Sequence, residues 1–332
     1  MVDSTALPEF ADVEAAAARI APHAVETPLF ENAALNKKLG GRIFLKPESL
    51  QRTGSFKFRG AYNRIGLIPE HERAGGVVAF SSGNHAQGVA AAAALFGIHA
   101  TIVMPKDAPR AKIEGTKALG AEVVYYDRLT DDREAIATMI MQERGATLVR
   151  PFDDPGIVAG QGTIGLEIAR QAAARGVRLD AVLVPCSGGG VVSGIALALS
   201  GASPGTLAIS VEPERFDGMR QSLAAGKRTE APGGALSIAD ALMAPIPGQV
   251  PFAIAKRLMR AAFAVTDEEL SRAVAYAAQY LKLIIEPGGS AGLAALLGGQ
   301  YDVHEKSVAV VLTGGNCDFE TVAACVAAYP ED

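Results

Sequence analysis

Residues 181–192 read AVLVPCSGGGVV, and they are the most informative stretch of the chain. The apolar run Ala181–Val184 is typical of a buried strand, Pro185 ends it, and three glycines form a turn before a helix predicted from Val191. The uncharged stretch 181–202 is long enough to suggest a membrane span, but the proline and the glycines divide it. The segment therefore predicts a strand, a turn and a buried helix of an α/β core, and we expect no membrane partner.

The same alternation extends along most of the chain. Runs of β-branched residues predict strands at residues 42–45, 76–80, 100–104, 122–126, 181–184, 207–211 and 308–312. Segments of helical period predict helices at residues 86–96, 111–119, 133–144, 162–175, 191–199 and 267–281. Strands that alternate with helices in this way are typical of parallel sheets.

The order of these elements predicts two domains. Residues 76–150 contain a βαβαβα series of their own, and the sequence Asp153-Asp154-Pro155-Gly156 breaks the pattern after it. We therefore expect a small domain of residues 76–150 inserted into a large domain built from residues 1–75 and 151–332, with the ligand between them.

Composition excludes several classes of protein. The chain has 332 residues, of which 49% are hydrophobic and 20% charged, so it is neither a disulfide scaffold nor a disordered tail. The net charge is −5 and no basic run is present, so we expect no nucleic-acid partner. The three cysteines form no CxxC pair, and Met1–Ser4 lacks the basic start of a signal peptide. We therefore expect a cytoplasmic protein.

Ligands of parallel sheets bind beyond the carboxyl ends of the strands, so the residues after each predicted strand are informative. Four such segments stand out, TGSFKFRG at 53–60, SSGNH at 81–85, SGGG at 187–190 and TGGN at 313–316. The SGGG loop precedes a predicted helix, whose free N–H groups and dipole suit a phosphate, although its spacing is that of neither common nucleotide loop. A tight turn that only packs a strand on a helix is the alternative.

Two of the other segments also have two interpretations. The hydroxyls and amide of SSGNH suit a carboxylate, but Ser81 or Ser82 is equally suited to cap a helix, and His85 to be a structural imidazole. Lys57 lies between Phe56 and Phe58, and apolar surroundings favour a neutral, nucleophilic amine. The alternative is a surface lysine that lays its aliphatic stem on the rings.

Taken together, these segments resemble the fold-type II pyridoxal-phosphate enzymes, and most closely the threonine/serine dehydratase and serine racemase family. The match is to the family's cofactor-lysine, substrate-carboxylate, phosphate and pyridine-nitrogen loops, in the family's order, and it extends from Thr27 to Asn316. The resemblance implies a two-lobed, tryptophan synthase β-like α/β fold, with parallel or mostly parallel twisted sheets flanked by helices. It also implies a homodimer.

The resemblance assigns roles to individual residues. It implies that Lys57 forms the Schiff base with pyridoxal 5'-phosphate and acts as base on the substrate Cα, with Ser82 on the opposite face. The implied cofactor-binding residues are Phe56, Lys57, Asn84, Ser187, Gly188, Gly189, Gly190, Val191, Glu286 and Thr313. The implied substrate-binding residues are Ser81, Ser82, Gly83, Asn84, His85 and Arg133. For Glu286 a solvated acid at a helix start is the alternative, and for Arg133 a surface helix position.

The implied reaction is loss of water from L-threonine or L-serine, because a neutral Thr313 hydroxyl at the pyridine nitrogen favours elimination over transamination. Serine racemase, motivated by Ser82, and 3-hydroxyaspartate dehydratase, motivated by Arg133, are the alternatives on the same scaffold. A binder that has lost the chemistry is a third. Part of the family has a cation site, for which Glu212, Phe216 and Asp217 are the nearest match here, and such ligands would suit Mg²⁺ or Ca²⁺.

Overall fold

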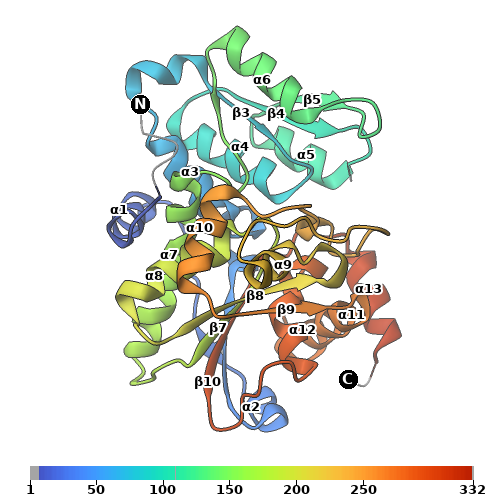
Figure 1. Cartoon of the computed structure of the whole chain (residues 1–332). Coiled ribbons are helices and arrows are strands. Elements are labelled where there is room, and N and C mark those ends of the chain that lie inside the picture. The colour runs from blue at the N-terminus through green and yellow to red at the C-terminus, as the bar shows by residue number, and fades with distance from the viewer. Residues whose placement is uncertain (1–6, 109, 331–332) are drawn as a thin grey trace.

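The computed structural model describes residues 7–108 and 110–330 (Figure 1). The N-terminal segment Met1–Ser4, on which we based part of the expected location, lies outside the described residues. The strands form two sheets, and the larger has the order β1-β2-β10-β7-β8-β9 while the smaller has the order β5-β4-β3-β6.

Parallel pairing dominates both sheets, as the alternating pattern predicts. The larger sheet comprises β1 (Phe30–Glu31), β2 (Arg42–Pro47), β7 (Ala181–Pro185), β8 (Leu207–Pro213), β9 (Ala261–Val265) and β10 (Ser307–Leu312). The smaller comprises β3 (Val77–Phe80), β4 (Ala100–Pro105), β5 (Glu122–Tyr126) and β6 (Thr147–Leu148). Only the pairing of β1 with β2 is antiparallel among these strands. The predicted α/β fold with mostly parallel sheets is confirmed.

Three strands have no counterpart among the predicted ones. β1 and β6 are each two residues long, too short to show a period. β9 reads AAFAV, and its alanines lack the β-branched character by which strands are recognised.

Helices cover the sheets (Figure 1). The first seven are α1 (Phe10–Ile20), α2 (Ala33–Leu39), α3 (Lys57–Gly66), α4 (Asn84–Phe96), α5 (Arg110–Ala118), α6 (Arg133–Arg144) and α7 (Pro155–Ala173). The others are α8 (Gly190–Ala202), α9 (Gly218–Ala225), α10 (Gln249–Leu258), α11 (Asp267–Tyr276), α12 (Ala291–Leu297) and α13 (Phe319–Ala328). No helix among the described residues is long and apolar enough to cross a membrane.

The start of α7 corrects the predicted helix at 162–175. The helix begins at Pro155, because the Asp154 carboxylate accepts a hydrogen bond from the Ile157 N–H at 3.0 Å and a proline is favourable in the first turn. The apparent break at residues 153–156 is therefore the cap and first turn of a helix.

The core of the smaller sheet includes residues from outside the segment 76–150. Phe58 and Ile65 of α3 and Ile157 of α7 pack in the same apolar cluster as Val77 and Ile102. Two helices on either side of this segment in the sequence therefore help to bury the smaller sheet. Each α3 side chain in this cluster lies within ten residues of Lys57, so the position of that lysine depends on packing against the smaller sheet.

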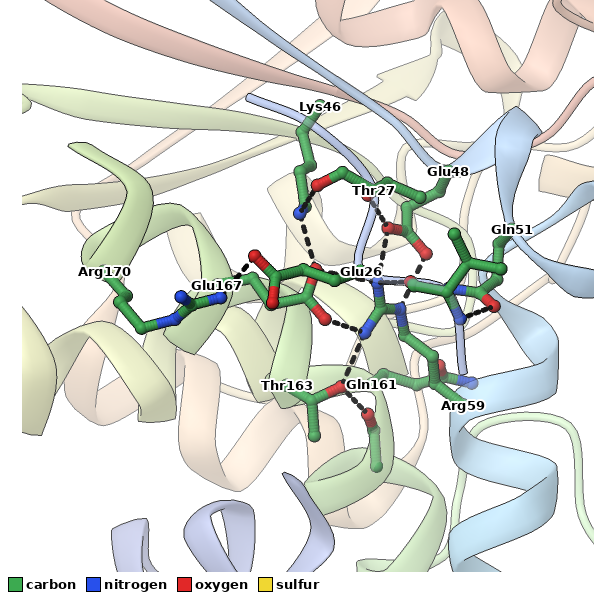
Figure 2. A network of polar contacts seen from close by, with 12 residues as sticks. Glu26, Thr27, Lys46, Glu48, Gln51, Arg59, Gln161, Thr163, Glu167 and Arg170 are labelled. Atoms are coloured by element: carbon green, nitrogen blue, oxygen red, sulfur yellow. Dashed lines mark hydrogen bonds and ion pairs between the residues drawn. The ribbon is translucent and has the colours of Figure 1, made fainter. Parts of the chain in front are cut away.

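A buried ionic network ties the first turn of α3 to β2 and α7 (Figure 2). Arg59 Nε donates to Glu48 Oε2 at 2.7 Å, and Arg59 Nη1 to Glu167 Oε1 at 2.6 Å. Lys46 Nζ donates to Glu167 Oε2 at 2.5 Å and to the Thr27 carbonyl oxygen at 2.6 Å. Although burial disfavours its charge, the neighbouring Arg59 holds the pKa of Glu48 below its usual value. Every charge in the network has an opposite partner, which is what buried charges require.

We expect Arg59→Leu to lower the free energy of unfolding by about 3–5 kcal/mol, because it leaves the fully buried Glu48 carboxylate without its guanidinium partner. Urea unfolding followed by circular dichroism measures the change. Arg42→Leu is the matched control, since it removes a more exposed pair with Glu31 and should cost about 1 kcal/mol or less. Equal losses in the two variants would show that the network does not hold the fold.

Candidate active site

A pocket of about 240 Å³ collects the segments that follow the strand ends. Its lining includes every residue predicted to be catalytic, cofactor-binding or substrate-binding, namely Phe56, Lys57, Ser81, Ser82, Gly83, Asn84, His85, Arg133, Ser187, Gly188, Gly189, Gly190, Val191, Glu286 and Thr313. These residues come from both sheets, and the fold brings them together from positions more than 250 residues apart in the sequence.

Lys57 is the first residue of α3, and its amine lies inside the pocket wall. Its Nζ donates to the Pro151 carbonyl oxygen at 2.8 Å and lies 5.2 Å from the centre of the Phe56 ring. Burial lowers the pKa of Lys57 to about 8, against the opposing charge of Glu286. The alternative of a surface lysine is therefore wrong, and a minor but appreciable fraction of the amine is neutral near physiological pH.

The glycine loop is shaped for close approach of a ligand to its backbone. Gly189 has φ +92°, a conformation that side chains rarely adopt, and a Cβ on Gly188 would lie 2.4 Å from the Phe152 ring. In α8 the first internal bond comes from the Ser193 N–H, which donates to the Gly189 carbonyl, so the preceding amides are available to an anion. The loop thus offers free N–H groups at a helix N-terminus, and its backbone conformation and close contacts require glycine.

The segment SSGNH turns into α4 without the expected side-chain cap. The N-cap residue is Gly83, and Ser81 Oγ accepts from the Gly83 N–H at 3.1 Å. Neither serine is the N-cap, so the capping alternative is wrong in that form. Ser82 lines the pocket, as the carboxylate-binding interpretation requires.

His85 is neutral and its ring is held by the backbone. Burial and the nearby charge of Lys57 lower its pKa to about 3. Nε2 lies 2.9 Å from the Val149 carbonyl oxygen, so Nε2 carries the proton and donates it to that oxygen. The structural interpretation of this imidazole therefore accounts for one of its two nitrogens, while Nδ1 is buried and has no hydrogen-bond partner in the part of the chain that the structure describes.

Glu286 is a buried acid of the pocket, so its interpretation as a solvated side chain is wrong. Its Oε1 accepts from Asn84 Nδ2 at 2.5 Å, and Asn84 Oδ1 accepts in turn from Asn316 at 2.8 Å. Burial raises the pKa of Glu286 to about 7. The second oxygen, Oε2, is buried and has no hydrogen-bond partner among the described protein groups. A buried polar atom of this kind indicates the place of a ligand.

Arg133 begins α6 at the rim of the pocket. Its guanidinium lies 5.3 Å from the centre of the Phe80 ring, and Phe80 also lines the pocket. The surface-helix and ligand-facing interpretations are thus both partly right, because the residue is exposed and also faces the pocket.

The expected cation site is not supported. Both oxygens of Glu212 accept backbone N–H groups, from Met219 at 2.9 Å and from Arg220 at 2.8 Å. Asp217 Oδ2 accepts from Arg220 Nε at 2.7 Å, and Phe216 ends a short 3₁₀ turn beside it. The described residues hold no group of three or more acidic, histidine or cysteine side chains placed to bind a metal ion. Glu212 and Asp217 instead organise the start of α9.

Several pocket residues do not follow a predicted strand, so the sequence did not identify them. Lys112 and Asp240 pair across the pocket at 2.9 Å, and Gln161 and Phe152 line its wall. Lys112 lies within a predicted helix and Asp240 follows no predicted strand. No local signal distinguishes either from an ordinary surface charge.

Comparison with known proteins agrees with this geometry. Residues 20–314 match the family model described as pyridoxal-phosphate dependent enzyme. The chain belongs to this family.

Individual members of this family are similar over most of their length. The chain is 43% identical to an L-threonine ammonia-lyase of Thermotoga maritima, over 89% of this chain and 72% of that protein. It is 42% identical to an L-threo-3-hydroxyaspartate ammonia-lyase of a Pseudomonas species, over 96% and 98% of the two chains. The solved structure of maize serine racemase has a TM-score of 0.90 at 34% identity, with 98% of each chain covered.

The pocket fits the cofactor of this pyridoxal-phosphate-dependent enzyme. Lys57 has the partly neutral amine that a carbonyl cofactor needs, and residues 187–191 have the free amides for a phosphate. The second oxygen of Glu286 adds a buried polar atom that no group of the described residues satisfies. These groups lie in the same pocket.

We expect the cofactor-free protein to capture pyridoxal phosphate faster as the pH rises, with a midpoint near 8, because the neutral Lys57 amine is the reactive form. Stopped-flow measurement of the visible cofactor band between pH 6.5 and 10 gives the midpoint. Lys57→Arg supplies the background from other lysines. A midpoint near the ordinary lysine value would mean that the amine is not desolvated.

Proposed function

We propose that this enzyme eliminates water from small hydroxy amino acids, L-threonine and L-serine, and releases 2-oxobutanoate or pyruvate with ammonia. The observation that supports this most is the placement of the buried Lys57 amine in one pocket with the carboxylate, phosphate and Thr313 loops. The similarity to an L-threonine ammonia-lyase over 89% of the chain supports the same substrate class.

Lys57 removes the proton from the substrate Cα. Pyridoxal phosphate, when bound, supplies the sink for the electrons that remain on that carbon. A base with a pKa of about 8 is well matched to neutral pH, because it is partly unprotonated and still binds a proton well. Ser82 is the candidate for proton exchange on the opposite face.

The loops hold the reactants in place. Backbone amides of residues 187–191 would hold the phosphate, and Thr313 would place a neutral hydroxyl at the pyridine nitrogen, which would favour loss of the β-substituent over transamination. Asn84 has a second amide hydrogen besides the one given to Glu286, and we assign it to the ring hydroxyl. Ser81, Ser82, Gly83, Asn84 and His85 form the substrate-carboxylate loop.

Arg133 supports a second candidate, elimination from 3-hydroxyaspartate. Among the described residues, the contact of this guanidinium is the Phe80 ring, and no ion pair is formed. A guanidinium free to bind two oxygens of a distal carboxylate suits a dicarboxylic substrate. The Pseudomonas relative named for that substrate is similar over almost the whole chain.

Other expectations extend this proposal. The homodimer, the cytoplasmic location and the division into domains at residues 76 and 150 stay predictions of the resemblance, the composition and the element order. Racemisation of serine stays open because of Ser82.

For the leading candidate, we expect Lys57→Ala to lower release of 2-oxo acid from L-threonine and L-serine by roughly 10³-fold or more, because both the cofactor anchor and the base are lost. A coupled assay of pyruvate and 2-oxobutanoate measures this, with chiral analysis of the remaining serine. Full turnover in the variant, or no turnover of either amino acid by the native enzyme, would refute the assignment.

For the second candidate, we expect Arg133→Met to lower kcat/KM for L-threo-3-hydroxyaspartate by about 10–100-fold, the cost of losing a charged hydrogen-bonded pair. The kcat/KM for L-threonine should stay within about 3-fold, because threonine has no distal carboxylate for the guanidinium to bind. Parallel steady-state assays decide between the candidates. A similar loss with both substrates would make Arg133 a structural residue of the rim.

A further inference from the structure

One ion pair crosses the pocket. Lys112 Nζ lies 2.9 Å from Asp240 Oδ2, and both residues line the pocket. Lys112 belongs to α5, beside the smaller sheet, whereas Asp240 begins a 3₁₀ turn, Asp240–Leu242, that packs with the larger sheet's core. The two side chains differ in exposure, since 12% of the Lys112 side chain and 50% of the Asp240 side chain are accessible.

The Lys112 amine lies against the carboxylate loop. A Cβ on Gly83 would lie 3.4 Å from Lys112 Nζ, which is ordinary contact distance. The hydroxyls and amides of the loop carry no charge of their own, so Lys112 provides the positive charge at this place. Although burial disfavours its charge, Asp240 raises the pKa of Lys112, and the acids Glu286 and Asp318 act in the same direction. The ammonium therefore stays protonated.

We propose that Lys112 binds the α-carboxylate of the substrate, and that Asp240 is the carboxylate it releases to do so. The inference rests on the proposed function in one respect, that the loop at 81–85 receives an amino acid. Exchange of one carboxylate for another keeps the buried ammonium paired, which avoids the large cost of an uncompensated charge. The half-exposed Asp240 regains water when it is released.

An alternative is that the pair only joins the two sides of the pocket. The two explanations predict opposite effects of removing Asp240 on the affinity for the amino acid. If the pair only joins the two sides of the pocket, loss of either partner weakens amino-acid binding. If Asp240 competes with the substrate, its removal strengthens binding, whereas removal of Lys112 weakens it.

The experiment is a titration of the pyridoxal-phosphate-loaded enzyme with L-alanine, followed by the change in the visible cofactor spectrum. L-Alanine has the α-carboxylate and amino group but no β-leaving group, so the titration reports binding without elimination. We expect Lys112→Met to raise the Kd at least about 10-fold, Lys112→Arg to stay within about 3-fold, and Asp240→Asn to lower the Kd about 3–10-fold. In the Lys112→Met background, Asp240→Asn should have no effect.

Lys117→Met is the matched control. Lys117 lies on the same helix, pairs with Glu114 and has a side chain 46% exposed, so the same substitution there should leave the Kd unchanged.

An unchanged Kd in Lys112→Met, or weaker binding in Asp240→Asn, would overturn the inference while native binding of L-alanine upheld the amino-acid site. If Lys112→Met does not fold, the sign of the Asp240→Asn change decides alone. A native enzyme that holds pyridoxal phosphate but binds neither L-alanine nor L-serine would contradict the proposed function itself, and this inference with it.

Discussion

The pairing of the Arg59 guanidinium with two carboxylates is the constraint on which the active site depends. Arg59 has no exposed surface and holds Glu48, the residue after β2, and Glu167 on α7 (Figure 2). It lies two residues after Lys57, so these bonds fix the helix turn from which the reactive amine projects. Close backbone contacts add to this, since a Cβ on Gly88 of α4 would lie 3.0 Å from the Lys57 carbonyl carbon. The amine is placed by a rigid scaffold rather than by a mobile loop.

Burial shifts the pKa values of two pocket residues in opposite directions. The same desolvation that lowers the pKa of Lys57 to about 8 raises that of Glu286 to about 7. In each group burial favours the neutral form, because the charged form is the one that water stabilises. The result is a base that is partly free near neutral pH, facing an acid that is partly protonated there. Lys112 differs because Asp240 compensates its burial, and its ammonium stays charged beside the carboxylate loop.

Strand ends explain why so much of the site could be predicted from the sequence. Ser81, Ser187 and Thr313 each follow a strand that pattern alone predicts, and the carboxyl ends of parallel strands face the same pocket. The cation site predicted at Glu212, Phe216 and Asp217 is not supported, for a related reason. Glu212 lies at the end of a strand and Asp217 follows soon after it, but both oxygens of Glu212 and one oxygen of Asp217 already accept hydrogen bonds from α9. Sequence spacing does not show whether a carboxylate is free.

The sequence by itself determined the alternating α/β order, the glycine loop before α8 and the lysine between two phenylalanines, because period, turn chemistry and side-chain type are local properties. Only the tertiary structure decided that the Lys57 amine is desolvated, that one oxygen of Glu286 has no partner among the described residues and that Lys112 meets Asp240 across 128 residues of sequence. Desolvation and ion pairing depend on which distant groups lie within a few ångströms. That proximity arises when helices beside two different sheets pack together, and no single segment of the chain encodes it.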